Sequence, residues 1–224
     1  MQVRSIDRRI DAKAKRRDRL TLVCLRAVLA ALGVLLIVPR SAFAGPEPAV
    51  TVTVRLYNFA QVSPAILARA EREASTILDA AGLHAAWVGC LEERASVESM
   101  ELCQKGWKVE FPSIRVLSGH LTTQFHDFEF GFASIPVFAT VNYEHIARRA
   151  LRDDTPSELP IILGCVIAHE LGHLLLRDPV HSASGIMQPQ WGHDQILQAL
   201  NGSLRFTTQE SMLIRERALE LQGR

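Results

Sequence analysis

Residues 159–176 read LPIILGCVIAHELGHLLL and carry apolar side chains on nearly every face of a helix. A surface helix shows a single apolar stripe, whereas a helix that is apolar all round is buried. The stretch therefore predicts a buried helix from Leu159 to Leu176. The rest of the chain has to pack around this helix, so it decides the fold.

Two histidines lie in this helix, in the run His169-Glu170-Leu171-Gly172-His173. Side chains at positions i and i+4 project from the same face one turn apart, so both imidazoles can reach a single ion. Glu170 is placed to act on a water molecule instead of binding the ion. The run predicts a zinc site, and two hydrogen-bonded core histidines without a metal are the alternative.

The third ligand has to come from the residues after the helix, because catalytic zinc takes three protein ligands and leaves one position open. The candidates are His181 and His193, with Asp178 and Asp194 as carboxylates. His181 follows a short turn that contains Asp178-Pro179 and can reverse the chain toward the ion. We expect His181 to complete the site, with His193 as the alternative.

The first 44 residues have the pattern of a signal peptide. Residues 1–19 carry eight Lys/Arg and three Asp, residues 27–38 carry no charge, and Ser41-Ala42-Phe43-Ala44 supplies small residues at an A-x-A site. We expect cleavage after Ala44, so the protein would be secreted or otherwise extracytoplasmic. An uncleaved membrane anchor is the alternative, but twelve uninterrupted apolar residues are few for a bilayer that needs about 20.

The charge of the mature part argues against nucleic acid as a partner. Ten of the 25 Lys/Arg and three of the 24 Asp/Glu lie in residues 1–44, so residues 45–224 have 15 basic and 21 acidic residues, a net charge of −6. Nucleic-acid binding needs a basic face for the phosphates. Contact with a membrane is expected only through an uncleaved signal.

Three cysteines remain in residues 45–224, and export would place them in an oxidising compartment. Cys90 and Cys103 flank a short polar segment and could close it with a disulfide. Cys165 lies within the apolar helical run and is expected to be a buried free thiol.

The remaining patterns predict an α/β domain. Val50–Tyr57 alternates and is β-branched, which indicates a strand. A helix is expected from the cap Ser63 and Pro64 to Gly82, with Ile66, Ala70, Ala74, Ile77 and Leu78 on its apolar face.

Further strands and one more helix follow along the chain. Strands are expected at His84–Val88, at Ile114–Leu117, and once or twice within Phe132–Val141, where Pro136 suggests an edge. A capping box at Thr207 and Glu210 predicts a last helix to about Leu221.

The segment after the buried helix resembles the metzincin zinc peptidases, in particular the matrixin branch. The shared motifs are His169-Glu-Leu-Gly-His173, His181-Ser182 and Gly185-Ile186-Met187-x-Pro189. The resemblance implies a zinc endopeptidase with one catalytic zinc and a peptide or protein substrate. It implies that Met187 packs beneath the metal without binding it. Gly131-Phe132-Ala133, followed by Pro136, resembles the edge strand that pairs with the substrate backbone.

The same resemblance implies a twisted mixed β-sheet with a buried active-site helix in residues 45–176. A small C-terminal subdomain, residues 177–224, would end in a helix. The chain departs from the family where Leu176 replaces a glycine and Pro179 replaces the third histidine, so His181 comes two residues late. No cysteine-bearing propeptide is expected between Ala44 and the first strand.

A loop with His120, His126 and Asp127 resembles the structural-ion loop of matrixins, but a solvated loop is the expectation.

Two alternatives to the whole interpretation stay open. One is a gluzincin-type peptidase with Glu210 or Glu216 as third ligand. The other is an exported zinc-binding domain that does not cut, against which the intact Glu170 argues. Neither Tyr57 nor Tyr143 is assigned a role.

Overall fold

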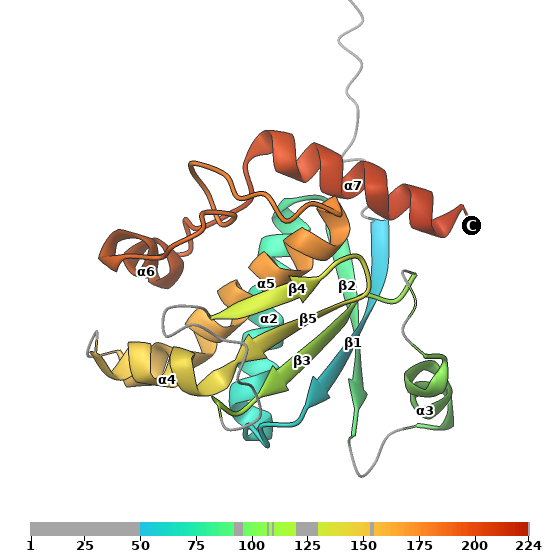
Figure 1. Cartoon of the computed structure of the whole chain (residues 1–224), viewed down its shortest axis with the longest axis horizontal. Helices are drawn as coiled ribbons and strands as arrows, with labels where there is room; N and C mark the ends of the chain where they lie inside the picture. Colours follow the sequence, from blue (N-terminus) through green and yellow to red (C-terminus); the bar gives the residue numbers. More distant parts are fainter. Residues whose placement is uncertain are drawn as a thin grey trace, which may run out of the picture. The chain divides into compact units, whose positions relative to one another are not determined.

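One mixed sheet of five strands forms the frame of the structure, a computed structural model (Figure 1). It describes residues 50–91, 96–106, 108, 110–119, 130–152 and 155–223. The predicted signal peptide and the loop with His120, His126 and Asp127 therefore lie outside the described residues. The strands are β1 (Val50–Asn58), β2 (Leu83–Cys90), β3 (Ser113–Leu117), β4 (Gly131–Ser134) and β5 (Phe138–Asn142).

The strand order is β2-β1-β3-β5-β4. β1 pairs in parallel with β2 and β3, and β3 pairs in parallel with β5. β4 alone runs antiparallel, against β5, and forms an edge of the sheet. The expected strands are thus confirmed, and the segment Phe132–Val141 proves to hold two. Pro136 lies in the turn between them and not within the edge strand.

Six α-helices occur in the described residues. They are α2 (Pro64–Ala80), α3 (Val97–Gln104), α4 (Tyr143–Arg152), α5 (Leu159–Leu176), α6 (His193–Leu200) and α7 (Thr208–Gln222), with a short 3-10 turn at Pro156–Glu158. Helices α2, α5 and α7 were expected from the sequence, whereas α3, α4 and α6 were not. The capping box of α7 is present, because Thr207 Oγ1 accepts from Glu210 N and Glu210 Oε2 accepts from Thr207 N.

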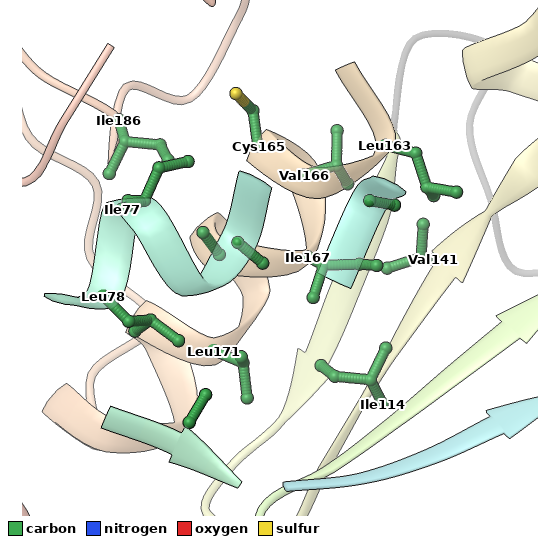
Figure 2. Close-up of a cluster of buried hydrophobic side chains, with 14 of the residues drawn as sticks. Ile77, Leu78, Ile114, Val141, Leu163, Cys165, Val166, Ile167, Leu171 and Ile186 are labelled. Atoms are coloured by element: carbon green, nitrogen blue, oxygen red, sulfur yellow. The ribbon is translucent and has the colours of Figure 1, made fainter. Parts of the chain in front are cut away.

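Helices α2 and α5 pack against each other on one face of the sheet (Figure 1). Figure 2 shows the resulting core, with Ile77 from α2, Val141 from β5 and Ile167 from α5 among its members. The buried face of α2 is the predicted one except at its start, where Leu67 is buried and Ile66 only partly so. Ser63 occupies the N-cap position without a side-chain capping bond.

The predicted buried helix is confirmed in α5, fifteen of whose eighteen residues are buried. Together with the preceding turn it has the length and hydropathy of a membrane span, but 83% of that window is buried inside the fold. It is the core helix of the domain.

The other face of the sheet is partly covered by the segment that carries α3. Cys90 and Cys103 form the expected disulfide, which ties this segment to the end of β2. Arg55 on β1 is fully buried and donates to the backbone oxygens of Leu102, Gly106 and Phe111. These hydrogen bonds replace the ones with water that the charged guanidinium loses when it is buried. Cys165 is a buried free thiol, and burial raises its pKa to about 12.

Candidate metal centre

Three imidazole rings meet at the C-terminal half of α5. The Nε2 atoms of His169 and His173 are 3.2 Å apart, as expected for residues one helical turn apart on the same face. His181, in the loop after α5, brings its Nε2 to 3.3 Å from Nε2 of His173. The three nitrogens all lie within 4.8 Å of one another, and no other such cluster occurs among the residues described.

Backbone carbonyls fix the orientation of the two helical histidines. Nδ1–H of His169 donates to the carbonyl oxygen of Ile186 over 2.7 Å, and Nδ1–H of His173 donates to that of Asp178 over 2.9 Å. A carbonyl can only accept, so each ring carries its proton on Nδ1 and presents a lone pair on Nε2. Metal-binding histidines are held in this way by a second hydrogen bond.

The site keeps its histidines neutral. Burial, with a smaller effect from His173, lowers the pKa of His169 to about 3. Burial also lowers the pKa of His173 and of His181. Neutral imidazole is the form that binds metal ions.

The cluster fits one zinc ion. In a tetrahedral site with Zn–N bonds of about 2.0–2.1 Å, two nitrogen ligands are about 3.3–3.4 Å apart. The two pairs that include His173 agree with this, at 3.2 and 3.3 Å. The lone pairs of His169 and His173 also face each other with no proton between them, an arrangement that a cation stabilises.

The longer turn after α5 still returns His181 to the helix. Arg177 ends the helix in the left-handed conformation, with a φ of 56°, and the Asp178 side chain accepts from the backbone N–H of Val180. The neighbouring Ser182 donates its backbone N–H to Met187 O and its hydroxyl to Glu210. Arg177, the residue after Leu176, thus adopts the left-handed conformation that glycine usually takes at the end of a helix.

The alternative ligands lie elsewhere. His193 and Asp194 are exposed in the first turn of α6, and neither belongs to the cluster. Glu210 uses its carboxylate to cap α7 and to hold Ser182. Glu216 is exposed on α7. Asp178 bonds to His173 through its backbone oxygen, while its carboxylate accepts from Val180 N.

Glu170 is 3% exposed and lies against the sheet edge. A Cβ on Gly131 would be 2.5 Å from Oε1 of Glu170 and 2.6 Å from the backbone oxygen of Thr140. Only glycine therefore fits at the start of β4 with the carboxylate in this position.

Met187 is fully buried beside α5. A Cβ on Gly172 would be 2.6 Å from its sulfur and 2.7 Å from the ring of Phe206. The glycine between Glu170 and His173 thus leaves room for the segment that also supplies the Ile186 carbonyl to His169. The role of Met187 as packing beneath the metal stays a prediction.

A cleft of about 290 Å³ opens over the histidines. Its lining comprises Phe130, Gly131, Phe132, Ala133, Ile135, Val166, His169, Glu170, His173, Pro179, His181, Gln188, Pro189 and Trp191. The predicted edge-strand residues thus lie along the same cleft as the metal cluster. Trp191 was not predicted as a site residue. Its ring meets that of His169 edge-on, with the ring centroids 5.8 Å apart. The sequence signal that pointed to it was its position two residues after Pro189.

The edge of β4 that faces away from β5 offers backbone groups for pairing. Phe130 O accepts from Asn142 N, so Phe130 and, two residues on, Phe132 direct their backbone groups toward β5. In an antiparallel pair the intervening residues point the other way. Gly131 and Ala133 therefore direct their N–H and C=O groups to the outer edge of β4, beyond which no other described strand lies.

Comparison with known proteins shows the fold. No protein-family model and no curated protein sequence matches the chain. Among solved structures, the chain is similar to a zinc-dependent peptidase from Methanocorpusculum labreanum (strain Z), with a TM-score of 0.50 and 19% sequence identity. The match covers 72% of this chain and 99% of the other. The α/β architecture with its mixed sheet therefore occurs in a zinc peptidase.

Proposed function

We propose that this protein is a zinc-dependent endopeptidase. The observation that carries the proposal is that three imidazoles and the Glu170 carboxylate line one cleft beside an edge strand. The protein of similar fold is described as a zinc-dependent peptidase, which agrees with this function. Metzincin membership, with Met187 as the turn methionine, is part of the proposal.

The residues of the site have separate tasks in this mechanism. His169, His173 and His181 would hold a zinc ion through their Nε2 atoms. When bound, zinc polarises the scissile carbonyl and lowers the pKa of water toward about 7. Glu170 accepts a proton from the attacking water as the new C–O bond forms. It then donates the proton to the amide nitrogen as the C–N bond breaks, which leaves a carboxylic acid and an amine.

The edge strand β4 positions the substrate. An extended peptide adds to a free sheet edge through main-chain hydrogen bonds, which hold it regardless of its side chains. Gly131 and Ala133 supply these groups beside Glu170. A bound peptide would therefore pass the metal site in a fixed orientation, which raises the rate of a step that needs aligned atoms.

Removal and return of the metal tests the function. Treatment with a chelator should abolish hydrolysis of an unfolded protein substrate, and about one equivalent of zinc should restore it, while circular dichroism confirms that the fold persists. An exported zinc-binding domain without activity would take up zinc and hydrolyse nothing. A protein that cuts equally well without metal would contradict the proposal.

Export is a further part of the proposal, with residues 1–44 as the cleaved signal peptide. The Cys90–Cys103 disulfide supports it, because such bonds persist in oxidising compartments. N-terminal sequencing of the mature protein should begin at Gly45. A chain that keeps residues 1–44 and stays in the cytoplasm would contradict this part alone.

A further inference from the structure

A second pocket adjoins the cleft and differs from it in charge. It has a volume of about 820 Å³ and shares Phe130 and Trp191 with the cleft. Its other lining residues are His145, Arg148, Arg149, Leu151, Arg152, Gln190 and Gly192. We name it the basic pocket. Its residues come mainly from α4 and from the segment before α6, which the fold brings together at one end of the sheet (Figure 1).

The charge of the basic pocket is opposite to that of the mature chain. Three arginines and one histidine line it, and no Asp or Glu is found among its described lining residues. The net charge of residues 45–224 is nevertheless −6. The C-terminus of α4 favours basic residues through the helix dipole, but the dipole does not require that they gather over a pocket that shares lining residues with the cleft.

The arginines of the pocket have different surroundings. Arg149 donates from Nη1 to the backbone oxygen of Trp191 over 2.8 Å, and so fixes the wall that separates the pocket from the cleft. Arg148 and Arg152 are exposed. Within the part of the chain that the structure describes, neither guanidinium group makes a hydrogen bond or an ion pair. Guanidinium groups bind carboxylates with two parallel hydrogen bonds.

The pocket lies within reach of a bound peptide. Phe130 directly precedes β4 and borders both the cleft and the pocket. An extended chain advances about 3.3 Å per residue. A peptide that follows β4 past Phe130 would therefore run from the cleft toward the basic pocket, which Phe130 also lines.

From these observations we propose that the basic pocket binds a carboxylate of the peptide substrate, a few residues from the scissile bond. The carboxylate is either an Asp or Glu side chain or the C-terminus of the peptide. This inference rests on the proposed peptidase function and adds a substrate class to it, namely peptides that present a carboxylate a few residues from the scissile bond.

Matched peptides and charge-reversal variants test the inference. Peptides of one sequence would carry Glu, Gln or Lys at successive positions on both sides of the scissile bond, each with a free or an amidated C-terminus. The wild-type protein should cleave the best Glu peptide with a kcat/KM about fivefold above its Gln counterpart, the upper range for a partly exposed ion pair. A preference for the free C-terminus over the amide would identify that carboxylate as the ligand.

The double variant Arg148→Glu/Arg152→Glu should lose this preference and favour the Lys peptide at the same position. Arg72→Glu is the matched control, since Arg72 is exposed on α2 and lines neither pocket. It makes half the change in charge and should leave the preference intact. The inference would be overturned if the wild-type protein cleaved Glu and Gln peptides equally and also showed no preference for a free over an amidated C-terminus. The same loss of preference in the control would overturn it too.

Binding separates this inference from the peptidase function. In the Glu170→Ala variant, which cannot use its general base, the affinities for Glu, Gln and Lys peptides can be measured by fluorescence anisotropy. If no peptide is cleaved by the wild type but the Glu peptide binds tightest and the double variant reverses the order, the pocket stands and the peptidase function fails. If the wild type cleaves peptides without any charge preference in rate or binding, the peptidase function stands and the inference about the basic pocket fails.

Discussion

The carboxylate of Glu170 lies so close to Gly131 that a single added methyl group would meet it at 2.5 Å. The residue assigned to proton transfer thus touches the strand assigned to substrate binding. A peptide paired with β4 would be carried past the carboxylate by the strand itself. A substitution at Gly131 can therefore displace the Glu170 carboxylate while residue 170 remains a glutamate.

Gly131→Ala should therefore lower kcat strongly while the zinc content stays near one. The added methyl group must displace Glu170 or push against Thr140 O, and overpacking of this kind costs about 1–3 kcal/mol of stability. Steady-state kinetics, elemental analysis and urea unfolding on one preparation measure the three effects. Ser134→Ala, at an exposed position of the same strand, is the control, and an unchanged kcat in Gly131→Ala would refute the placement of Glu170.

Gly172→Ala should weaken zinc binding, because its methyl group would push Met187 and with it the Ile186 carbonyl that orients His169. Met187→Leu should retain the zinc, since a change of similar volume usually costs less than about 1.5 kcal/mol and Met187 packs without binding the ion. Zinc affinity by competition with a fluorescent chelator distinguishes the two. A large loss of affinity in Met187→Leu would make the sulfur a ligand instead.

His181→Ala should reduce zinc affinity sharply, whereas His193→Ala should leave it nearly unchanged. His181 lies 3.3 Å from His173 in the cluster, and His193 lies exposed at the start of α6. The same competition assay measures both variants. Should His193 prove the sensitive position, the turn after α5 must be placed differently.

Glu210→Gln should keep its zinc and lose less than about 1 kcal/mol of stability, because glutamine also serves in a capping box. Glu210→Ala should lose about 1–3 kcal/mol, since it leaves the Thr207 N–H and the Ser182 hydroxyl without their acceptor. Chemical unfolding with and without zinc measures these values, and Glu216→Ala is the exposed control on the same helix. Loss of zinc in Glu210→Gln would revive the gluzincin alternative.

The long elements and the metal cluster could be predicted because their signals are local. A largely apolar run of 18 residues predicts α5. Two histidines four residues apart on that helix can be paired without knowledge of the remaining fold. His181 required only that a turn with Asp178-Pro179 reverse the chain. The proline expected in an edge strand proved to lie in a turn, since the edge strand itself has four residues.

The short helices could not be predicted in the same way. Isolated helices of 8–10 residues are marginal, and their stability comes from tertiary packing. α3 has no buried residue and is held by a disulfide and by Arg55, which is remote in sequence. The basic pocket joins α4 to Trp191, whose backbone oxygen bonds to an arginine 42 residues earlier. No local sequence pattern predicts such a contact.

The central claim is most directly tested by zinc content and peptide hydrolysis measured on one preparation of Glu170→Ala. A general base contributes in the transition state, and its loss typically costs about 10²–10⁴-fold in rate. The variant should keep its fold and about one zinc per chain and lose hydrolysis by a factor in this range, while Glu216→Ala retains both. Undiminished hydrolysis by Glu170→Ala would contradict the account even with the zinc site intact.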